Sequence, residues 1–440
     1  MFNRIKIDLL IFKIIINLYY KMFLSKNEKN NIINIISLYF LKDIAKIIFN
    51  YYYDEIIYST NKSFAAKTIN GDLLIWGDCI YEYTKFTGNI VSIKSFTNAF
   101  IINFKNNKND IIFCNSKDIP INHLNIDHIY STLFGISHAI KLKNGDVITY
   151  GNKHYGGKIN FELKNVDTIQ STNTAFAAKQ KNGNVVVWGK NSCADINNIE
   201  DKLKNVNKIY STILAYAAKL YNGDVITWGY SDYGGDCSSV QHLLKNVDTI
   251  YSTERAFAAK LKNGNIITWG DKQYGGDCSS VQHLLKNVDT IYSTLSAFAA
   301  KLKNGNIITW GDNKYGGDTS AINHLLEDVD TIYSTSSTFI AHLKNKNVIS
   351  WGEYNNKLEN VKQIYITKDA FTVKYINNEI ESFGNKYYGG DLSSIKHLLK
   401  NVDRIYSNNF SFAAVLDNGE IITWGDKLYG GKLNNSLLYK

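Results

Sequence analysis

Two cysteine–histidine pairs have a spacing that metal sites can use. Cys237 and His242 are separated by four residues, and Cys278 and His283 repeat the pattern 41 residues later. A structural zinc ion needs four converging ligands, whereas the next copy of this segment has Thr319 where the cysteine would stand. We therefore expect no metal site and no bound cofactor.

Other titratable residues recur once per copy of a repeated segment. Repeating one residue in every copy does not bring different catalytic groups together. We therefore expect the histidines to pack or to cap, and the aspartates to accept hydrogen bonds in turns or at helix starts. The sequence lacks GxxxxGK[ST], HExxH and GxSxG motifs. We expect no catalytic residue and no enzyme; the alternative, an enzyme, predicts one polar cluster in the divergent segments 98–120 or 354–383. The histidines are His123, His242, His283, His324 and His397, and the aspartates are Asp236, Asp277, Asp318 and Asp391.

Six tyrosines occupy one loop position in six of the copies. Tyrosine is favoured at protein interfaces, so a ring of these side chains could line a binding face. The other interpretation is that each ring wedges between adjacent repeats. These candidate protein-binding residues are Tyr155, Tyr233, Tyr274, Tyr315, Tyr388 and Tyr429.

The elements that position these residues come from a tandem repeat. Residues 246–286 and 287–327 are nearly identical, which indicates recent duplication. Each unit contains an aromatic-Gly pair, and these pairs give ten units between residues 54 and 440 if the degenerate pair Phe113-Cys114 is included. All seven tryptophans of the chain stand in these pairs. The pairs are Trp76-Gly77, Tyr150-Gly151, Trp188-Gly189, Trp228-Gly229, Trp269-Gly270, Trp310-Gly311, Trp351-Gly352, Phe383-Gly384 and Trp424-Gly425.

Each unit predicts three short strands, at 248–253, 256–262 and 265–270 in the clearest copy. Asn263-Gly264 lies between the last two, which predicts a two-residue type I′ hairpin with positive φ at both residues. After the third strand comes Tyr-Gly-Gly-Asp, where paired glycines suit a close backbone approach, and then a single helical turn that Ser or Asp can cap.

Three strands cannot bury both faces of their sheet alone. Stacking the units face to face hides their Ile, Phe, Ala and Trp side chains, and a ring also protects the ends of the stack. The fold class predicted is all-β: a propeller, or an open propeller-like ring, of about ten three-stranded units, with a short helical segment before it.

The pattern A-x-x-L-x-N-G-x-h-x-x-W-G-x-x-x-Y-G-G, with h apolar, resembles the repeats of the regulator of chromosome condensation family over residues 54–440. The 41-residue period is similar to the short-repeat branch, which includes a bacterial β-lactamase inhibitor propeller. The resemblance implies a ring of blades whose loops dock other proteins. Family rings usually close at seven blades, so ten units leave open a larger ring, a ring with extra units, or an open spiral.

The charge and the cysteine content limit the kind of partner and the cellular compartment that we expect. The formal net charge is +9, but lysines spread through the repeats supply it and only three residues are arginine. Nucleic-acid surfaces concentrate arginine, so we expect a protein partner and no nucleic acid. Five cysteines without a CxxC pair indicate free thiols in a reducing, intracellular compartment, cytoplasm or nucleus.

Residues 1–53 form a separate segment, predicted to be helical from the spacing of its polar residues over 31–53. The apolar stretch 9–20 is interrupted by Lys13 and Asn17 and is short for a membrane span, so we expect no membrane anchor. The segment either caps the first repeat or serves as an adaptor, since residues 36–47 resemble the core of an F-box.

Taken together, these features predict a monomeric, cofactor-free, non-catalytic protein-interaction scaffold, in which loop tyrosines anchor the partner and lysines steer its approach. One alternative function is an F-box-like substrate receptor of a ubiquitin ligase. Another, carried by the family resemblance, is a guanine-nucleotide-exchange-type regulator of a small GTPase.

Overall fold

The structure is a computed structural model that describes residues 57–67, 73–78, 85–86, 90–104, 109–113, 125–132 and 135–433. The chain divides into two compact units, Met1–Ile56 and Ile57–Lys440. The predicted helical segment, cap and F-box-like module of residues 1–53 lie outside the described residues. No helix in the described part of the chain has the length and apolar character that crossing a bilayer requires.

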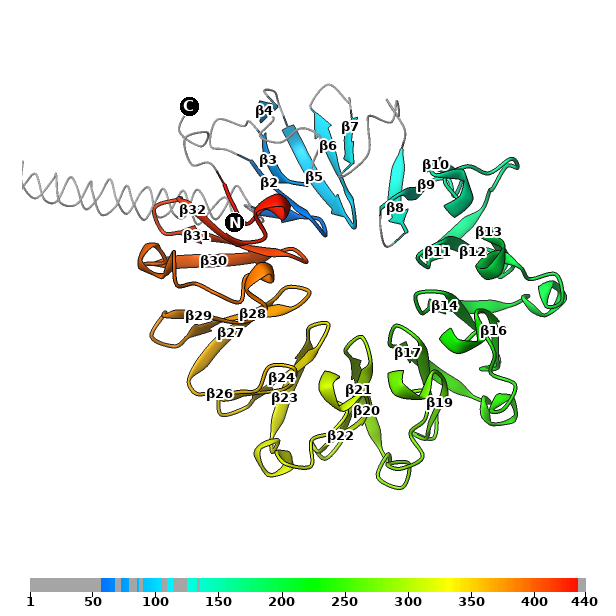
Figure 1. Cartoon of the computed structure of the whole chain (residues 1–440). Coiled ribbons are helices and arrows are strands. Elements are labelled where there is room, and N and C mark those ends of the chain that lie inside the picture. Colours follow the sequence, from blue (N-terminus) through cyan, green and yellow to red (C-terminus); the bar gives the residue numbers. More distant parts are fainter. Residues whose placement is uncertain are drawn as a thin grey trace, which may run out of the picture. The chain divides into compact units, whose positions relative to one another are not determined.

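Ten antiparallel sheets follow one another around a ring in the second unit (Figure 1), as the repeat count predicts. Eight have three strands, and the first and eighth have a short fourth strand in the described residues. The first five sheets are β1–β4 (Ile57–Ser59, Ser63–Lys67, Leu73–Gly77, Lys85–Phe86), β5–β7 (Ile90–Phe96, Ala99–Phe104, Asn109–Phe113), β8–β10 (Ile126–Ser131, Ser137–Leu142, Val147–Gly151), β11–β13 (Val166–Ser171, Ala175–Gln180, Val185–Gly189) and β14–β16 (Val206–Ser211, Ala215–Leu220, Val225–Gly229). The last five are β17–β19 (Val247–Ser252, Ala256–Leu261, Ile266–Gly270), β20–β22 (Val288–Ser293, Ala297–Leu302, Ile307–Gly311), β23–β26 (Val329–Ser334, Thr338–Leu343, Val348–Gly352, Asn356–Leu358), β27–β29 (Val361–Ile366, Ala370–Tyr375, Ile380–Gly384) and β30–β32 (Val402–Ser407, Ser411–Leu416, Ile421–Gly425).

The core consists of the layers between neighbouring sheets. In the middle strand β18, Phe257 and Ala259 pack toward the preceding sheet, and Ala256 and Ala258 pack toward the following one. Successive strand side chains point to opposite faces, and small alanines let the sheets approach closely. The predicted face-to-face stacking is therefore confirmed.

The Trp-Gly and Tyr-Gly-Gly motifs join several sheets to their neighbours. Trp269 Nε1 in the sixth sheet donates to the carbonyl oxygen of Gly234, in the loop of the fifth, at 3.0 Å. Gly234 has φ +87°, and a Cβ there would lie 2.6 Å from Phe257, so only glycine fits. The predicted close approach at the paired glycines is confirmed. Equivalent bonds are donated by Trp188, Trp310 and Trp351.

The ring closes, which decides a question that the repeat count leaves open. Trp76 Nε1 in the first sheet donates to the Gly430 carbonyl oxygen in the loop of the last, at 3.2 Å. The backbone of Asn409 donates to Asn61 at 3.0 Å. The indole bond found between other neighbouring sheets thus also joins the last sheet to the first, and a backbone bond accompanies it.

The hairpin after the second strand differs from the predicted type. Gly264 has φ +86°, but Asn263 is not among the residues with positive φ, so the turn is not type I′. The Gly264 N–H donates to the Leu261 carbonyl oxygen and the Leu261 N–H to the Asn265 carbonyl oxygen, each at 2.9 Å. This is a type I turn closed by a left-handed residue. Asn263 has another task, because its Oδ1 accepts from the Asn265 N–H at 3.0 Å.

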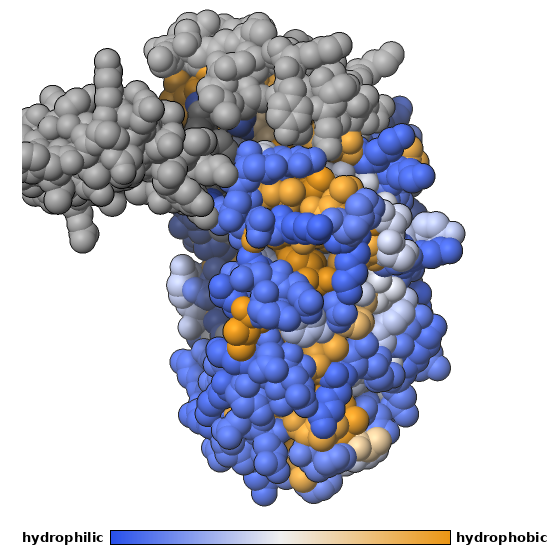
Figure 2. Space-filling model, turned by 90° about the vertical axis from the view of Figure 1, so that its left-hand side faces the viewer, coloured by the Kyte–Doolittle hydropathy of each residue, from blue (hydrophilic) through white to orange (hydrophobic). Residues whose placement is uncertain are grey.

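The segment after most third strands forms 3₁₀ turns, such as Ser231–Tyr233 (η3) and Gln241–Leu243 (η4). A short α-helix, α3 (Asn191–Ala194), follows β13 instead, and β26 follows β25. The single helical turn predicted there is present as η4, but Val240 stands at its N-cap and no side chain caps it. Seen from the side that carries β26, β29 and β32, the surface of the ring is mostly hydrophilic, with narrow apolar strips (Figure 2).

Candidate functional site

A short turn between the first and second strands of each sheet, the inner turn, has a constant frame. In the sixth sheet Thr253 Oγ1 accepts from the Ala256 N–H at 3.1 Å and donates to the Tyr274 carbonyl oxygen at 2.8 Å. Thr212, Thr294 and Thr367 repeat both bonds. The frame therefore fixes the two residues that follow each threonine.

The inner turns are joined to one another around the ring. The first residue after the threonine donates its N–H to the carbonyl oxygen of its counterpart in the next sheet, for example Glu254 to Leu295 at 2.9 Å. Eight such bonds run without interruption from Asn173 through Asn409 and Asn61 to Thr97. We call this chain of turns the collar. It holds the inner turns at a fixed spacing.

The collar borders a central cavity of about 770 Å³. Hydroxyl groups dominate its wall, because the Ser-Thr pairs at the ends of five first strands, from Ser171-Thr172 to Ser334-Thr335, lie there. Ser252 Oγ donates to the Ser211 carbonyl oxygen at 2.9 Å, and Ser211 Oγ to that of Ser171 at 3.0 Å. The wall is polar and is held by bonds between sheets.

Between the two most similar copies, the two residues of the inner turn differ while the three strands around them do not. Glu254-Arg255 in one copy becomes Leu295-Ser296 in the next, although all three strands are identical. The other differences between these copies lie in 272–286 and its counterpart. The described inner-turn pairs are Asn61-Lys62, Thr97-Asn98, Asn173-Thr174, Ile213-Leu214, Glu254-Arg255, Leu295-Ser296, Ser336-Ser337, Lys368-Asp369 and Asn409-Phe410.

The six predicted tyrosines lie next to this face, and each is half-buried. Each ends a 3₁₀ turn just before a left-handed glycine. Tyr233, Tyr274, Tyr315 and Tyr388 pack partly against the clusters between sheets. Wedging between repeats and exposure on a face therefore coexist in the same side chains.

The second residue of an inner turn inserts between successive loop tyrosines. Arg255 has its guanidinium 4.8 Å from the ring centre of Tyr233 and 4.7 Å from that of Tyr274. Phe410 occupies the same place in the last sheet, with ring centres 5.3 Å from Tyr388 and 4.5 Å from Tyr429. Arg255 and Phe410 thus each lie between two successive loop tyrosines.

Asp369 is the inner-turn acid in the ninth sheet. Burial raises its pKa, although its carboxylate accepts from Ser337 Oγ at 2.7 Å and from Asn385 Nδ2 at 3.3 Å. Glu353 adds a repulsion that also raises this pKa. The divergent segment 354–383 does hold a polar group, but its hydrogen bonds join two sheets.

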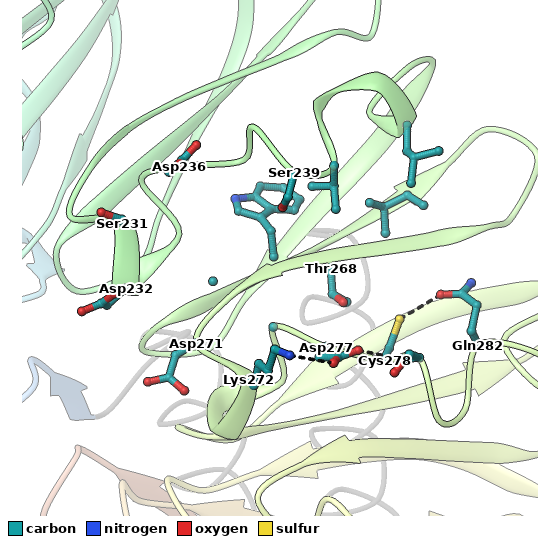
Figure 3. A pocket seen from close by; sticks show the side chains of 17 residues that line it. Ser231, Asp232, Asp236, Ser239, Thr268, Asp271, Lys272, Asp277, Cys278 and Gln282 are labelled. Carbon is teal, nitrogen blue, oxygen red and sulfur yellow. Dashed lines mark hydrogen bonds and ion pairs between the residues drawn. The ribbon is translucent and has the colours of Figure 1, made fainter.

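A second hollow, of about 690 Å³, lies between the loops of the fifth and sixth sheets (Figure 3). Asp232, Asp236, Asp271 and Asp277 line it. The predicted turn role of the aspartates is confirmed, because Asp277 Oδ1 accepts from the Ser279 N–H at 2.9 Å. The same bond forms at Asp236, Asp318 and Asp391.

The repeated histidines were predicted to pack or cap, and this prediction is wrong where the structure describes them. His242, His283, His324 and His397 are exposed; His123 lies outside the described residues. The paired cysteines are buried instead, and Cys237 Sγ donates to Gln241 Oε1 at 3.0 Å. Burial raises the pKa of the Cys237 and Cys278 thiols, which disfavours the nucleophilic thiolate.

No protein-family model and no curated protein matches this chain. Solved structures similar to it include the ectodomain of the Physcomitrella patens receptor kinase CR4, with 14% identity over 57% of this chain and 71% of that one and a TM-score of 0.33. Prp20p from Saccharomyces cerevisiae, in a study of its binding to Gsp1p and histones, has 14% identity over 53% and 76%, with a TM-score of 0.32.

A further match is the complex of Kap60 with yeast RCC1 (Prp20), with 13% identity over 64% of this chain and 80% of that one and a TM-score of 0.29. The similar structures thus include proteins of the regulator family that the repeat motif resembles.

Sequence reasoning missed the inner-turn residues, among them Arg255, Asp369 and Phe410. The signal was available, because Glu254-Arg255 and Leu295-Ser296 interrupt otherwise identical strands. Without the fold, nothing indicates that the inner turns of distant repeats lie side by side around the ring.

Proposed function

We propose that the chain is a non-catalytic scaffold that binds a protein partner through the face formed by the collar and the loop tyrosines. The observation that carries this proposal is the variation of inner-turn residues on an invariant frame. Residues needed only for folding would be copied with the strands, as Ala256–Leu261 is. Side chains that contact a partner are free to differ from one turn to the next.

The composition of the face supports a protein ligand. It presents apolar Ile213 and Leu295, charged Glu254 and Lys368, and half-buried tyrosines. Mixed polar and aromatic surfaces of this kind are typical of protein interfaces. The fixed spacing of the collar also keeps the entropic cost of ordering low when a partner binds.

The test starts from proteins captured by the full-length chain, with each candidate partner then purified. Binding is measured by calorimetry for the wild type and for a variant carrying Ile213→Glu and Leu295→Glu, which places charge in two inner turns. We expect at least a tenfold loss of affinity. The control carries Lys262→Glu and Lys303→Glu, in exposed outer hairpins of the neighbouring sheets.

Equal affinity of the inner-turn variant, the control and the wild type would contradict the proposed face. Turnover of a small molecule by the purified chain would contradict the non-catalytic role. The adaptor alternative gains no support from the geometry, because the F-box-like segment lies outside the described residues.

A further inference from the structure

We propose that Arg255 is the anchor on this face for an Asp or Glu side chain of the protein partner, an inference that rests on the proposed scaffold function. Arg255 belongs to the inner turn of the sixth sheet, between β17 and β18. The corresponding residues in the neighbouring sheets are Leu214 and Ser296. One of the chain's three arginines therefore stands at a position that the two neighbouring copies fill with uncharged side chains.

The guanidinium is held in place before any ligand arrives. Tyr233 and Tyr274, from the loops of two neighbouring sheets, lie on it at 4.8 and 4.7 Å. Stacking of this kind suits arginine, whose planar group is more weakly hydrated than an ammonium group. Because the side chain is already ordered, little conformational entropy remains to be lost when it binds.

The same guanidinium lacks a countercharge within the described part of the chain. No carboxylate there lies within ion-pair distance of it, and its Nε is buried without a hydrogen-bond partner. The nearby Asp271 is committed elsewhere, since its Oδ1 accepts from the Gln273 N–H at 2.9 Å. A ligand must therefore approach the terminal amino groups, which can donate two parallel hydrogen bonds to a carboxylate.

The surroundings favour a single carboxylate over a polyanion. Asp271 lies beside the backbone of Arg255, because the Asp271 N–H donates to the Arg255 carbonyl oxygen at 3.0 Å. Asp271 also lines the hollow of Figure 3, together with three more aspartates. A nucleic-acid backbone would bring several phosphates toward these carboxylates and be repelled.

The collar also indicates where in the partner the carboxylate lies. Ile213 and Leu295 flank Glu254 along the chain of backbone hydrogen bonds. A partner that contacts both must continue on either side of Arg255. We therefore infer a side-chain carboxylate within a loop or strand of the partner, rather than a chain terminus.

The test uses the small number of arginines. In the ¹⁵N-labelled full-length chain the three Nε–Hε signals are followed by nuclear magnetic resonance, and the Arg255 signal is assigned by its loss in Arg255→Ser. That variant copies the residue found at Ser296, so the turn tolerates it. The probes are the peptides acetyl-Gly-Glu-Gly-amide and acetyl-Gly-Gln-Gly-amide, acetyl-Gly-Ala-Gly with a free carboxyl terminus, and a ten-residue oligothymidylate.

We expect the Glu peptide to shift the Arg255 signal saturably and at least fivefold more than the Gln peptide does. Arg404, which lies 3.5 Å from Asp403, is the internal control and should not shift. Equal shifts with the Glu and Gln peptides would overturn the proposal. So would tighter binding of the free-terminus peptide or of the oligothymidylate.

A gain of function gives an independent arm. Ser296→Arg places a guanidinium in the inner turn of the seventh sheet, at the position next to the loop tyrosines Tyr274 and Tyr315. A new Nε–Hε signal that responds to the Glu peptide is expected, and an unresponsive one would show that the tyrosine pair does not create the anchor.

The purified partner separates failure of this proposal from failure of the scaffold function. Arg255→Ser should weaken partner binding at least tenfold, and Arg404→Ser should leave it unchanged. Full partner affinity in Arg255→Ser would sink the anchor and leave the scaffold intact. Absence of any partner for the wild type would sink the scaffold, whatever the peptides do.

Discussion

Replacing Gly275 by alanine tests the contact by which one sheet fits the next. Gly275 has φ +88°, and a Cβ there would lie 2.6 Å from Cδ2 of Phe298 in the following sheet. Its carbonyl oxygen also accepts the Trp310 Nε1 hydrogen bond at 3.0 Å. Gly305 is the matched control, because it has φ +92° and a Cβ there would meet nothing within 4 Å.

The two substitutions share one energetic term and differ in another. A left-handed backbone costs a non-glycine residue about 1 to 2 kcal/mol, and Gly305→Ala should cost only this. In Gly275→Ala the methyl group meets the fully buried Phe298 ring. Overpacking and a weakened indole hydrogen bond add about 2 to 4 kcal/mol, for a total of about 3 to 6 kcal/mol.

Urea unfolding of the full chain, followed by tryptophan fluorescence, measures the difference. All seven indoles occupy the Trp-Gly position, so the signal reports on the layers between sheets. The Gly275→Ala midpoint should fall well below that of Gly305→Ala. If the two variants unfold together, the glycine is not required by its neighbour and the account of how the sheets interlock is wrong.

Three further predictions use single side chains. Burial lowers the pKa of His138 from 6.5 to about 4, so the native state resists protonation and loses stability as the pH falls from 7 to 5, by about 2 kcal/mol. His138→Phe copies the residue that other sheets have at this position, and it should make the urea midpoint nearly independent of pH between 7 and 5. His283→Phe, at an exposed position, should leave the pH dependence of the midpoint as in the wild type. The same pH dependence in His138→Phe as in the wild type would refute the prediction. Burial raises the pKa of Asp369, so its ionisation lowers stability as the pH rises above about 4; Asp369→Asn should unfold at higher urea than the wild type at pH 7, with the gain shrinking toward pH 4, and a loss at pH 7 would contradict it. Trp76→Phe removes the ring-closing bond to Gly430, whereas Trp424→Phe removes a buried Nε1 that has no hydrogen-bond partner among the residues that the structure describes. The first variant should be less stable than the second by about 1 kcal/mol, and equal urea midpoints for the two would argue against the closing bond.

The repeat, its three strands and the stacking of its units were predictable because each follows from local pattern. Alternating apolar residues and turn residues at a constant period leave one economical way to bury the sheet faces. The hairpin type was predicted wrongly, because Asn263 tolerates both signs of φ and its side-chain bond to Asn265 favours the negative one. The histidines were misplaced because a repeated polar residue is equally compatible with a packed and a solvent-facing loop.

By itself, the sequence determined that ten similar sheets exist and which residues lie between them. The reason is that side chains on a strand alternate between its two faces, so the apolar pattern shows which residues are buried. Only the tertiary structure decided that the ring closes, that inner turns from distant repeats border one cavity, and that Arg255 lies between two tyrosines. These features depend on the small rotation from each sheet to the next, summed over the whole ring, and no local pattern encodes that sum.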